Sequence, residues 1–235
     1  MKKSLNLSTD EVPNSLEDHM FYGLELDEEQ KNFRDNIWNK EKLIIFCNSK
    51  SGTGKTTVAT ATANLLVEYG LYDGIVYIAS PTQEQKLGFL KGGIEEKTEP
   101  YFEPFYQALN TIGVNVSTSV NQQSIMNRKN GTGYIECCTH TYLRGCNFKN
   151  KVVICDEAQN FYFDEMKKTL TRMHDSCKVI ILGHSDQCDL FKNQEKSGFV
   201  KYLEHFKNSN DKRAAVCNLN VNHRGWISTY ADSLL

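Results

Sequence analysis

The sequence predicts an α/β protein in which helices flank both faces of a mostly parallel sheet. Two observations lead to this fold class. Short apolar runs alternate along the chain with stretches of helical periodicity, and strands that alternate with helices form parallel sheets through right-handed crossovers. The first of these runs, at 43–47, is apolar without interruption, which is typical of a strand buried on both faces.

Six apolar runs are the candidate strands, and they lie at 43–47, 75–79, 134–138, 152–155, 179–182 and 214–219. The first helix is expected at 27–40, where Asp27 can cap its start. A second helix is expected to run from residue 55 to about residue 69, because Gly70 favours a helix end. Further helices are expected in pieces within 83–111, at 164–173 and at 196–207.

The chain is expected to form one domain preceded by an arm. Residues 1–24 are polar, contain Pro13 and show little periodicity, so they are predicted to be an N-terminal arm. Residues 25–235 are the predicted domain. A chain of 235 residues is long enough to bury a substantial core without disulfides or structural metals.

Composition and charge narrow the classes of function. Hydrophobic residues make up 40% and charged residues 24% of the chain, as in ordinary globular proteins. The formal net charge is −2, whereas a dedicated duplex-binding domain usually carries a basic excess. Any nucleic acid is therefore expected to bind in a local groove.

The cysteines and the apolar runs indicate a compartment. The eight cysteines form no C-x-x-C pair, which argues against the common zinc sites and predicts reduced thiols in a cytoplasmic protein. A membrane span takes about 18 apolar residues or more. No run in this sequence reaches that length, so the protein is not expected to span a membrane.

A glycine-rich loop follows the first apolar run, and its core is Gly52-Thr53-Gly54-Lys55-Thr56. Glycines let backbone N–H groups converge on phosphate oxygens, and the helix that starts at Lys55 adds its positive dipole end. In this P-loop pattern the lysine reaches the β- and γ-phosphates, and the threonine hydroxyl coordinates Mg²⁺. The sequence therefore predicts a site for ATP and Mg²⁺. Its candidate nucleotide-binding residues are Ser49, Lys50, Ser51, Gly52, Thr53, Gly54, Lys55, Thr56 and Thr57.

One position departs from the P-loop pattern G-x-x-x-x-G-K-[ST]. The pattern asks for glycine at position 49, where this chain has Ser49. Because that glycine eases the turn out of the strand, the serine is expected to tighten the loop or to weaken nucleotide binding.

Two carboxylates, Asp156 and Glu157, end the apolar run at 152–155. They are expected at the carboxyl edge of the sheet, where α/β folds bind ligands. Asp156 is a candidate metal residue together with Thr56, and orients Mg²⁺ through water. Glu157 is the candidate base that polarises the attacking water. The alternative is a helix N-terminus whose acidic residues merely complement the helix dipole.

Several longer sequence segments are more specific for a protein family than the P-loop and the Asp-Glu pair. They include Lys86-Leu87-Gly88-Phe89-Leu90, Tyr142-Leu143-Arg144-Gly145 and Asp156-Glu157-Ala158-Gln159-Asn160. Over residues 27–230 the chain resembles the PhoH-like family, relatives of the ATPase core of superfamily 1 helicases. The resemblance implies a single RecA-like P-loop NTPase domain that binds ATP and is associated with RNA handling and phosphate starvation. It also implies a homo-oligomer, since members of the family tend to form rings.

The resemblance implies roles for two glutamines. Gln30 matches an adenine-reading glutamine ahead of the P-loop, and the alternative is a polar residue on an exposed helix face. Gln187 fits the role of a γ-phosphate sensor, the alternative being a loop residue that satisfies backbone groups. The family pattern around it has an acid where this chain has His184. That replacement is expected to impair turnover more than binding.

Arginines are the remaining catalytic candidates. Arg224 matches a family arginine near the C-terminus, and a guanidinium can neutralise transition-state charge in its own chain or from a neighbouring subunit. Arg144 and Arg172 are candidates for the same role, or for gripping nucleic-acid phosphates. For each of the three, the alternative is a surface salt bridge.

Three functions are weighed for these residues. The predicted one is a Mg²⁺-dependent ATPase that works on RNA or single-stranded DNA. Its predicted catalytic residues are Lys55, Glu157, Gln187 and Arg224. The second is a nucleotide-binding switch with little turnover, which Ser49 and His184 favour. The third is a nucleoside kinase, since thymidine-kinase-like enzymes also combine a P-loop with Asp-Glu-Ala-Gln, but their four-cysteine zinc lasso has no counterpart here.

Overall fold

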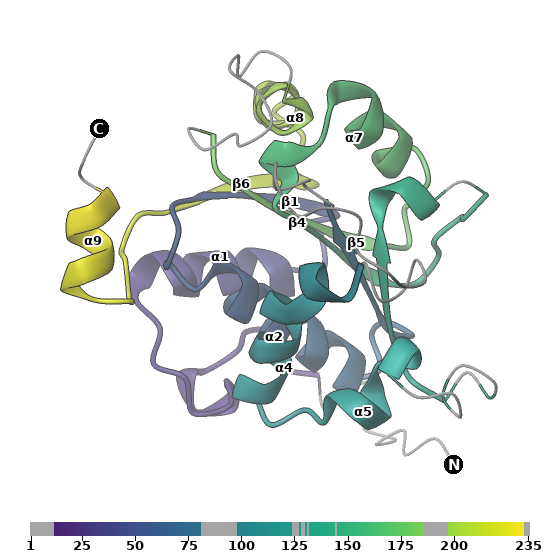
Figure 1. Ribbon diagram of the computed structural model, residues 1–235, viewed down its shortest axis with the longest axis horizontal. Helices are drawn as coiled ribbons and strands as arrows, with labels where there is room; N and C mark the ends of the chain where they lie inside the picture. Colours follow the sequence, from purple (N-terminus) through teal and green to yellow (C-terminus); the bar gives the residue numbers. More distant parts are fainter. Residues whose placement is uncertain are drawn as a thin grey trace, which may run out of the picture.

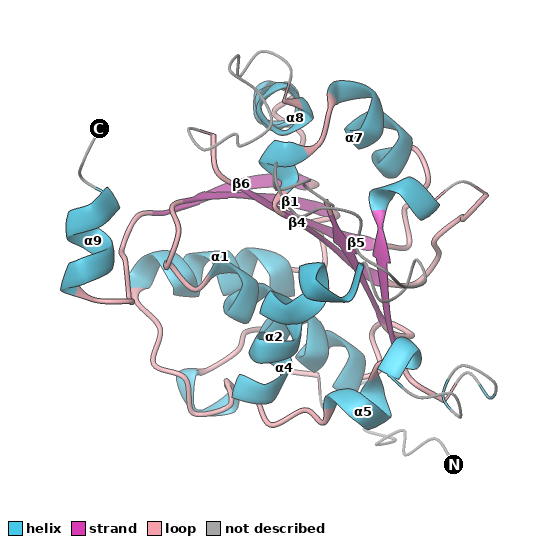
Figure 2. Cartoon of the chain, viewed as in Figure 1, coloured by secondary structure: helices cyan, strands magenta, loops and turns pink. Residues whose placement is uncertain are grey.

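A six-stranded sheet runs through the centre of the protein, and helices lie on both of its faces (Figure 1; Figure 2). The structure is a computed structural model and describes residues 12–80, 98–123, 127, 130, 132–143, 145–185 and 197–232. Its strands are β1 (Ile44–Ser49), β2 (Ile75–Ala79), β3 (Ile135–Thr139), β4 (Val152–Asp156), β5 (Lys178–Gly183) and β6 (Ala214–Leu219). Every predicted strand is confirmed to within two residues at either end.

The strand order places the candidate site. The order is β3-β2-β4-β5-β1-β6, and each of these neighbouring pairs is parallel. The carboxyl ends of the strands therefore meet at one edge of the sheet. Because β5 separates β1 from β4, the loop after β1 and the carboxylates after β4 lie on either side of the end of β5. The predicted α/β class with a parallel sheet is confirmed.

One face of the sheet is covered by α1 (Glu28–Trp38), α2 (Lys55–Glu68), α4 (Glu103–Thr111) and α5 (Val116–Ser119) (Figure 1). Its core contains the fully buried side chains of Phe33, Ile45, Leu66, Tyr77 and Phe105. The rings of Tyr77 and Phe105 stack with centroids 4.3 Å apart. This packing fixes the middle of β2 beside the site.

The opposite face is covered by α7 (Phe163–Leu170) and α8 (Gly198–Asn208), which enclose Phe46, Phe161, Met166 and Phe199. Short 3-10 helices lie at Asp18–Met20, Glu99–Phe102, Asn121–Gln123, His140–Tyr142 and Ala158–Asn160. The C-terminal helix α9 (Trp226–Asp232) stands apart from both layers in Figure 1. Its Trp226, Ile227 and Tyr230 are exposed.

The helix predictions are confirmed where the structure describes the chain, with small changes at the ends. Asp27 caps α1 by accepting a hydrogen bond from the backbone N–H of Gln30, and Gly70 follows the end of α2 with a φ of 70°. The helices predicted at 164–173 and 196–207 are α7 and α8. Of the pieces predicted within 83–111, α4 is present, and residues 81–97 lie outside the described residues. No helix in the described part of the chain is long and apolar enough to cross a membrane.

Residues 12–24, which the sequence assigns to the arm, pack against the domain. Leu16 and Phe21 are buried in the same core as the helices of that face. The indole nitrogen of Trp38 donates to a backbone carbonyl of this segment over 3.0 Å. The structure thus differs from the predicted arm here, because two isolated apolar side chains anchor a segment that shows no periodicity. Residues 1–11 lie outside the described residues.

The seven described cysteines are free thiols, as the sequence predicts, and Cys188 lies outside the described residues. Five of the seven are buried. Burial raises the pKa of the Cys217 thiol to about 11 and that of Cys138 to about 12. Both thiols are therefore neutral near pH 7 and behave as small apolar side chains.

Lys178, the first residue of β5, is a buried cation. Its ammonium donates to the backbone carbonyl of Asn39 over 2.6 Å and to that of Lys42. Both acceptors follow α1 in the chain. Burial lowers the pKa of Lys178 to about 8, because the protein interior disfavours the charged form. The lysine ties the chain after α1 to β5 at the cost of a desolvated charge.

We expect Lys178 to make stability depend on pH. Its pKa in the folded protein is below its ordinary 10.5, so the unfolded chain binds more protons between these two values and stability rises with pH. From about pH 7.5 to 10.5, the free energy of unfolding should improve by about 1–3 kcal/mol relative to Lys178→Met. Urea denaturation across this range measures the difference, with the exposed Lys40→Met as control. A pH-independent difference contradicts the account.

Candidate nucleotide-binding site

The loop after β1 has the backbone that a phosphate cradle needs. Gly52 and Gly54 have φ values of 78° and 75°, and Gly54 is the residue immediately before α2. A Cβ atom on Gly54 would lie 2.8 Å from the side-chain Nε2 of Gln30, and one on Gly52 would lie 2.8 Å from Asn222 Oδ1. Both positions therefore require glycine, and α2 points its N-terminus into the loop.

Ser49 fits the loop without conformational strain. It is the last residue of β1, is buried, and pairs with Leu219 of β6. The left-handed turns fall at Gly52 and Gly54 instead. Position 49 therefore does not need a glycine for its backbone conformation, and an effect of Ser49 on nucleotide affinity stays a prediction.

Asp156 is the buried centre of the site, with 1% of its surface exposed. Its Oδ2 accepts hydrogen bonds from Thr56 Oγ1 and Tyr77 Oη, each over 2.9 Å. Its Oδ1 accepts one from the backbone N–H of Glu157 over 2.8 Å. Burial raises the pKa of the Asp156 carboxyl, with Glu157 adding to the rise, while Lys55 and the hydrogen-bond donors oppose it. Three donors aimed at one carboxylate orient it rigidly.

The oxygens of Thr56 and Asp156 fit Mg²⁺, which prefers hard oxygen ligands. They come from different elements, α2 and the end of β4, and lie within hydrogen-bond distance of each other. The described residues contain no cluster of three or more His, Cys, Asp or Glu able to hold a metal. In nucleotide sites, phosphates and waters usually complete the coordination of Mg²⁺ around one or two protein oxygens.

Tyr77 was not predicted to belong to the site, and we expect Tyr77→Phe to measure its contact with Asp156. The substitution keeps the ring that stacks on Phe105 and removes one hydrogen bond to a buried carboxylate. The free energy of unfolding should fall by about 1.5–3 kcal/mol, the range for hydrogen bonds to charged groups. Tyr69→Phe, at the end of α2, is the control for losing a hydroxyl. Equal effects of the two variants in urea denaturation contradict the assigned contact.

Glu157 turns the other way and is half exposed. Its backbone is left-handed, with φ 51° and ψ 39°. Its Oε1 lies 3.7 Å from Lys55 Nζ, and its Oε2 accepts a hydrogen bond from Gln159 Nε2 over 2.6 Å. Lys55 and Gln159 therefore hold the carboxylate over the P-loop.

Gln159 is a second residue that sequence reasoning missed. Its Oε1 accepts a hydrogen bond from the backbone N–H of His184 over 3.2 Å. The amide thereby connects Glu157 to the residue that follows β5. In the sequence, Gln159 belongs to the segment 156–160, which resembles the PhoH-like family, and no role was predicted for it. Gln187 lies outside the described residues, so its role as a sensor stays a prediction.

Gln30 lies under the P-loop, with 5% of its surface exposed. Its Nε2 donates to the carbonyl of Thr53 over 2.9 Å, and its Oε1 accepts from the backbone N–H of Asp27 over 3.1 Å. The alternative of an exposed polar residue is therefore wrong. Gln30 joins the start of α1 to the P-loop, and its reading of adenine stays a prediction.

The structure places Arg224 and Arg172, two of the three candidate arginines, at opposite edges of the sheet. Arg224 lies at the P-loop of its own chain, where its Nη1 donates to Ser51 Oγ over 3.0 Å. Arg172 lies in the loop that leads into the amino end of β5 and donates to the carbonyl of Cys146 over 3.4 Å. It is therefore at the far edge of the sheet from Lys55. Arg144 lies outside the described residues.

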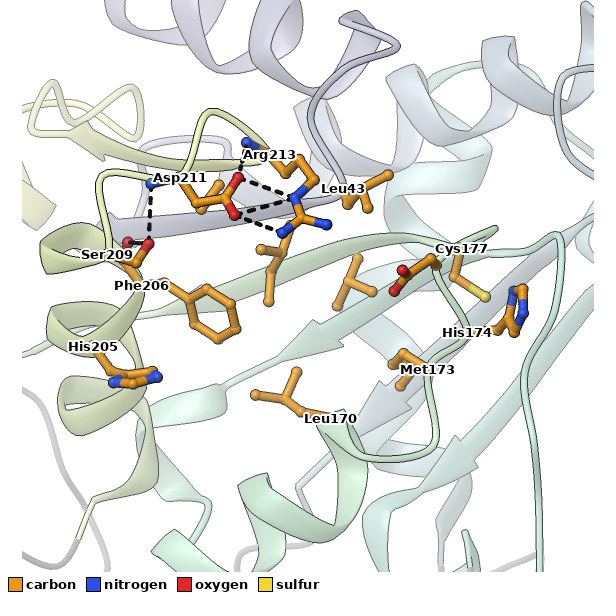
Figure 3. Close-up of a pocket in the computed structure, with 14 residues that line it drawn as sticks. Leu43, Leu170, Met173, His174, Cys177, His205, Phe206, Ser209, Asp211 and Arg213 are labelled. Atoms are coloured by element: carbon orange, nitrogen blue, oxygen red, sulfur yellow. Dashed lines mark hydrogen bonds and ion pairs between the residues drawn. The ribbon is translucent and has the colours of Figure 1, made fainter.

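A cavity lies at the edge of the sheet opposite the P-loop. It has a volume of about 300 Å³ and opens among Leu43, Leu170, Met173 and Phe206, beside the Asp211–Arg213 ion pair (Figure 3). These residues come from the amino ends of strands and the C-terminal parts of α7 and α8. The cavity contains none of the predicted site residues and is distinct from the P-loop site.

Comparisons with known proteins place this chain in a family. The chain matches the PhoH family, described as PhoH-like protein, over residues 25–224. This chain belongs to the PhoH-like family. It is 35% identical over 170 residues to protein PhoH of Escherichia coli (strain K12), which covers 72% of this chain and 46% of that protein. It is also 35% identical over 170 residues to the PhoH-like protein of Bacillus subtilis (strain 168), covering 72% of this chain and 50% of that protein.

The chain spans about half the length of these curated relatives. Among solved structures, the UvsW helicase from bacteriophage T4 has a similar fold, with a TM-score of 0.53 and 12% sequence identity. The match covers 83% of this chain and 60% of that chain. It confirms the predicted RecA-like fold. The chain thus belongs to the PhoH-like family and has a fold similar to that of this helicase, with a P-loop after β1.

Proposed function

We propose that this PhoH-like protein is a Mg²⁺-dependent ATPase that acts on RNA or single-stranded nucleic acid. The observation that supports hydrolysis most strongly is the difference in environment between two adjacent carboxylates. Asp156 is buried and bonded to Thr56, whereas Glu157 is half exposed and lies beside Lys55. A buried acid that orients the metal and an accessible acid that polarises the attacking water are one combination that supports hydrolysis at a P-loop.

The P-loop residues bind the triphosphate. The backbone N–H groups around Gly52 and Gly54 would donate to the β- and γ-phosphates, and Lys55 would leave Glu157 to neutralise them. Thr56 and Asp156 are the residues that would hold Mg²⁺. When bound, this ion would neutralise charge on the phosphate oxygens. Its positive charge would also offset the cost of keeping the Asp156 carboxylate buried.

Glu157 accepts the proton of the attacking water. Its carboxylate is exposed enough for a water to reach it, and Gln159 holds one of its oxygens in place. Once Lys55 turns to the phosphates, Oε1 is available as the base. Arg224 and Gln187 are proposed to neutralise and sense the γ-phosphate.

The proposals of a nucleic-acid partner and of a homo-oligomer rest on the family resemblance. With a net charge of −2, the chain is expected to bind a single strand in a local groove rather than on a broad basic face. The ATPase domain described above does not by itself form the two-domain cleft of a processive helicase, and we propose that strand movement uses a homo-oligomer, a ring or a partner. The free thiols of the described cysteines fit a reducing compartment, and we place the protein in the cytoplasm.

The second candidate is a nucleotide-binding switch with little turnover. The observation that favours it is His184, which stands where the family pattern has an acid and whose backbone is linked to Glu157 through Gln159. A switch of this kind binds ATP tightly and releases phosphate at background rate.

Phosphate release from Mg·ATP, with and without single-stranded RNA, tests the proposal. The wild type is compared with Lys55→Ala and Glu157→Gln. The proposal predicts turnover that RNA stimulates and that both substitutions abolish. If the wild type binds ATP but releases phosphate no faster than the two variants, the nucleotide-binding switch is supported instead. If RNA does not change the rate of phosphate release, the proposed action on nucleic acid is wrong.

A further inference from the structure

Residues 220–224, here named the clasp, are tied to the start of α1. The Oε2 atom of Glu29 accepts a hydrogen bond from the backbone N–H of Asn220 over 2.6 Å, and its Oε1 accepts one from Asn220 Nδ2 over 3.0 Å. Asp27 Oδ2 lies 2.8 Å from His223 Nε2. Two carboxylates at one helix end therefore hold a segment about 190 residues away in the sequence.

The other side of the clasp lies on the P-loop. The backbone N–H of His223 donates to the carbonyl of Gly52 over 2.9 Å. Asn222 Oδ1 accepts the backbone N–H of Arg224 over 2.8 Å and occupies the space that a side chain at Gly52 would need. Arg224 then reaches Ser51. The clasp thus bridges the start of α1 and the P-loop.

Polar contacts, rather than core packing, fix the clasp. Val221 is 48% exposed and Trp226, which follows it, is 74% exposed. In Figure 1 the chain leaves β6, passes the start of α1 and continues into α9, away from both layers of helices. Hydrogen bonds from Asn220 also hold the pKa of the Glu29 carboxyl below its ordinary value. The carboxylate therefore stays ionised and a strong acceptor near pH 7.

We infer that Glu29 and Asp27 are positioning residues that hold Arg224 over the P-loop of its own chain, so that Arg224 acts in cis. This inference rests on the proposed ATPase function and narrows it. A guanidinium stabilises transition-state charge only when it is held near the γ-phosphate. Since the clasp has little packing of its own, the carboxylates of α1 set the position of the arginine.

Substitution at neighbouring glutamates tests the positioning. Glu29→Ala is expected to lower kcat for ATP by about tenfold, because the arginine loses its fixed position. Glu28→Ala removes an acid from the same helix turn, and Glu28 pairs with Lys31 rather than with the clasp. That variant should keep the wild-type kcat. Asp27→Asn keeps an N-cap residue of equal strength while weakening the contact with His223, and should lower kcat without unfolding α1.

A double-mutant cycle separates positioning from a general structural effect. If Glu29 acts through Arg224, the double variant Glu29→Ala/Arg224→Ala has the kcat of Arg224→Ala, since there is no arginine left to position. If the two losses multiply, Glu29 acts independently of Arg224 and the inference is overturned. Equal kcat for Glu29→Ala and Glu28→Ala overturns it as well.

Mixing variants tests whether Arg224 acts in its own chain. When Lys55→Ala and Arg224→Ala proteins are combined, action in cis gives no more activity than the sum of the two. Recovery of activity means that Arg224 serves a neighbouring subunit, and overturns the inference. If the wild type has no Lys55-dependent turnover, the proposed function itself fails. ATP affinity then decides the positioning role, since Glu29→Ala must weaken it and Glu28→Ala must not.

Discussion

Replacing Glu157 with glutamine is expected to lower kcat for ATP hydrolysis by about 10²–10⁴-fold, the usual contribution of a general base. The substitution keeps the length of the side chain and removes its ability to accept a proton. Lys55 and the P-loop backbone remain in place, so ATP should bind with nearly wild-type affinity. Phosphate release and equilibrium binding of ATP, measured on the same preparation, separate the two effects.

The control for this variant is Glu204→Gln, an exposed glutamate on α8 away from the P-loop. It should leave both kcat and ATP affinity unchanged. If Glu157→Gln keeps more than about a tenth of the wild-type kcat, the base is another group and Glu157 serves only as the ion-pair partner of Lys55.

Asp156→Asn is expected to abolish Mg²⁺-dependent turnover without destabilising the protein. The substitution removes a buried charge that no cation contacts at hydrogen-bond distance among the described residues, and the relief of its desolvation cost offsets the weakening of its hydrogen bonds. An amide nitrogen in place of Oδ2 would face the hydroxyls of Thr56 and Tyr77, which can turn to accept. The amide oxygen would keep the bond from the backbone N–H of Glu157. Mg²⁺, however, loses its anionic partner.

Two measurements on Asp156→Asn check this expectation. The free energy of unfolding without nucleotide should equal or exceed that of the wild type, and Mg²⁺ should no longer strengthen ATP binding. Asp73→Asn, an exposed aspartate before β2, is the control and should change neither quantity. A large loss of stability together with intact Mg²⁺-dependent binding contradicts the metal role.

The sequence predicted that Thr56 and Asp156, which are 100 residues apart, belong to one site, because each lies at a position fixed by local pattern. One follows a glycine-rich loop, and the other ends an apolar run. Parallel strands bring both to the same edge of the sheet, and the two side chains meet at 2.9 Å. The parallel-sheet rule and the two motifs sufficed to bring both residues to one edge of the sheet, and the structure supplies their hydrogen bond.

The contacts of Tyr77, Gln159 and the clasp needed the structure. Tyr77 lies in a continuous apolar run, where a tyrosine is expected to be core. Its hydroxyl reaches Asp156 because β2 and β4 pair with Ala79 opposite Asp156, a register that no local pattern specifies. Glu29 and Asn220 are polar residues 191 positions apart. Composition and periodicity contain no signal that would pair them.

The most direct test of the account is single-turnover phosphate release from preformed complexes of the protein with Mg·ATP. The wild type and Glu157→Gln are each loaded with substoichiometric ATP, and bound nucleotide and free phosphate are followed together. The account predicts that both proteins bind the ATP and that the wild type releases phosphate about 10²–10⁴-fold faster. Wild-type complexes that retain intact ATP as long as Glu157→Gln complexes do would contradict it, and would leave a nucleotide-binding switch as the function.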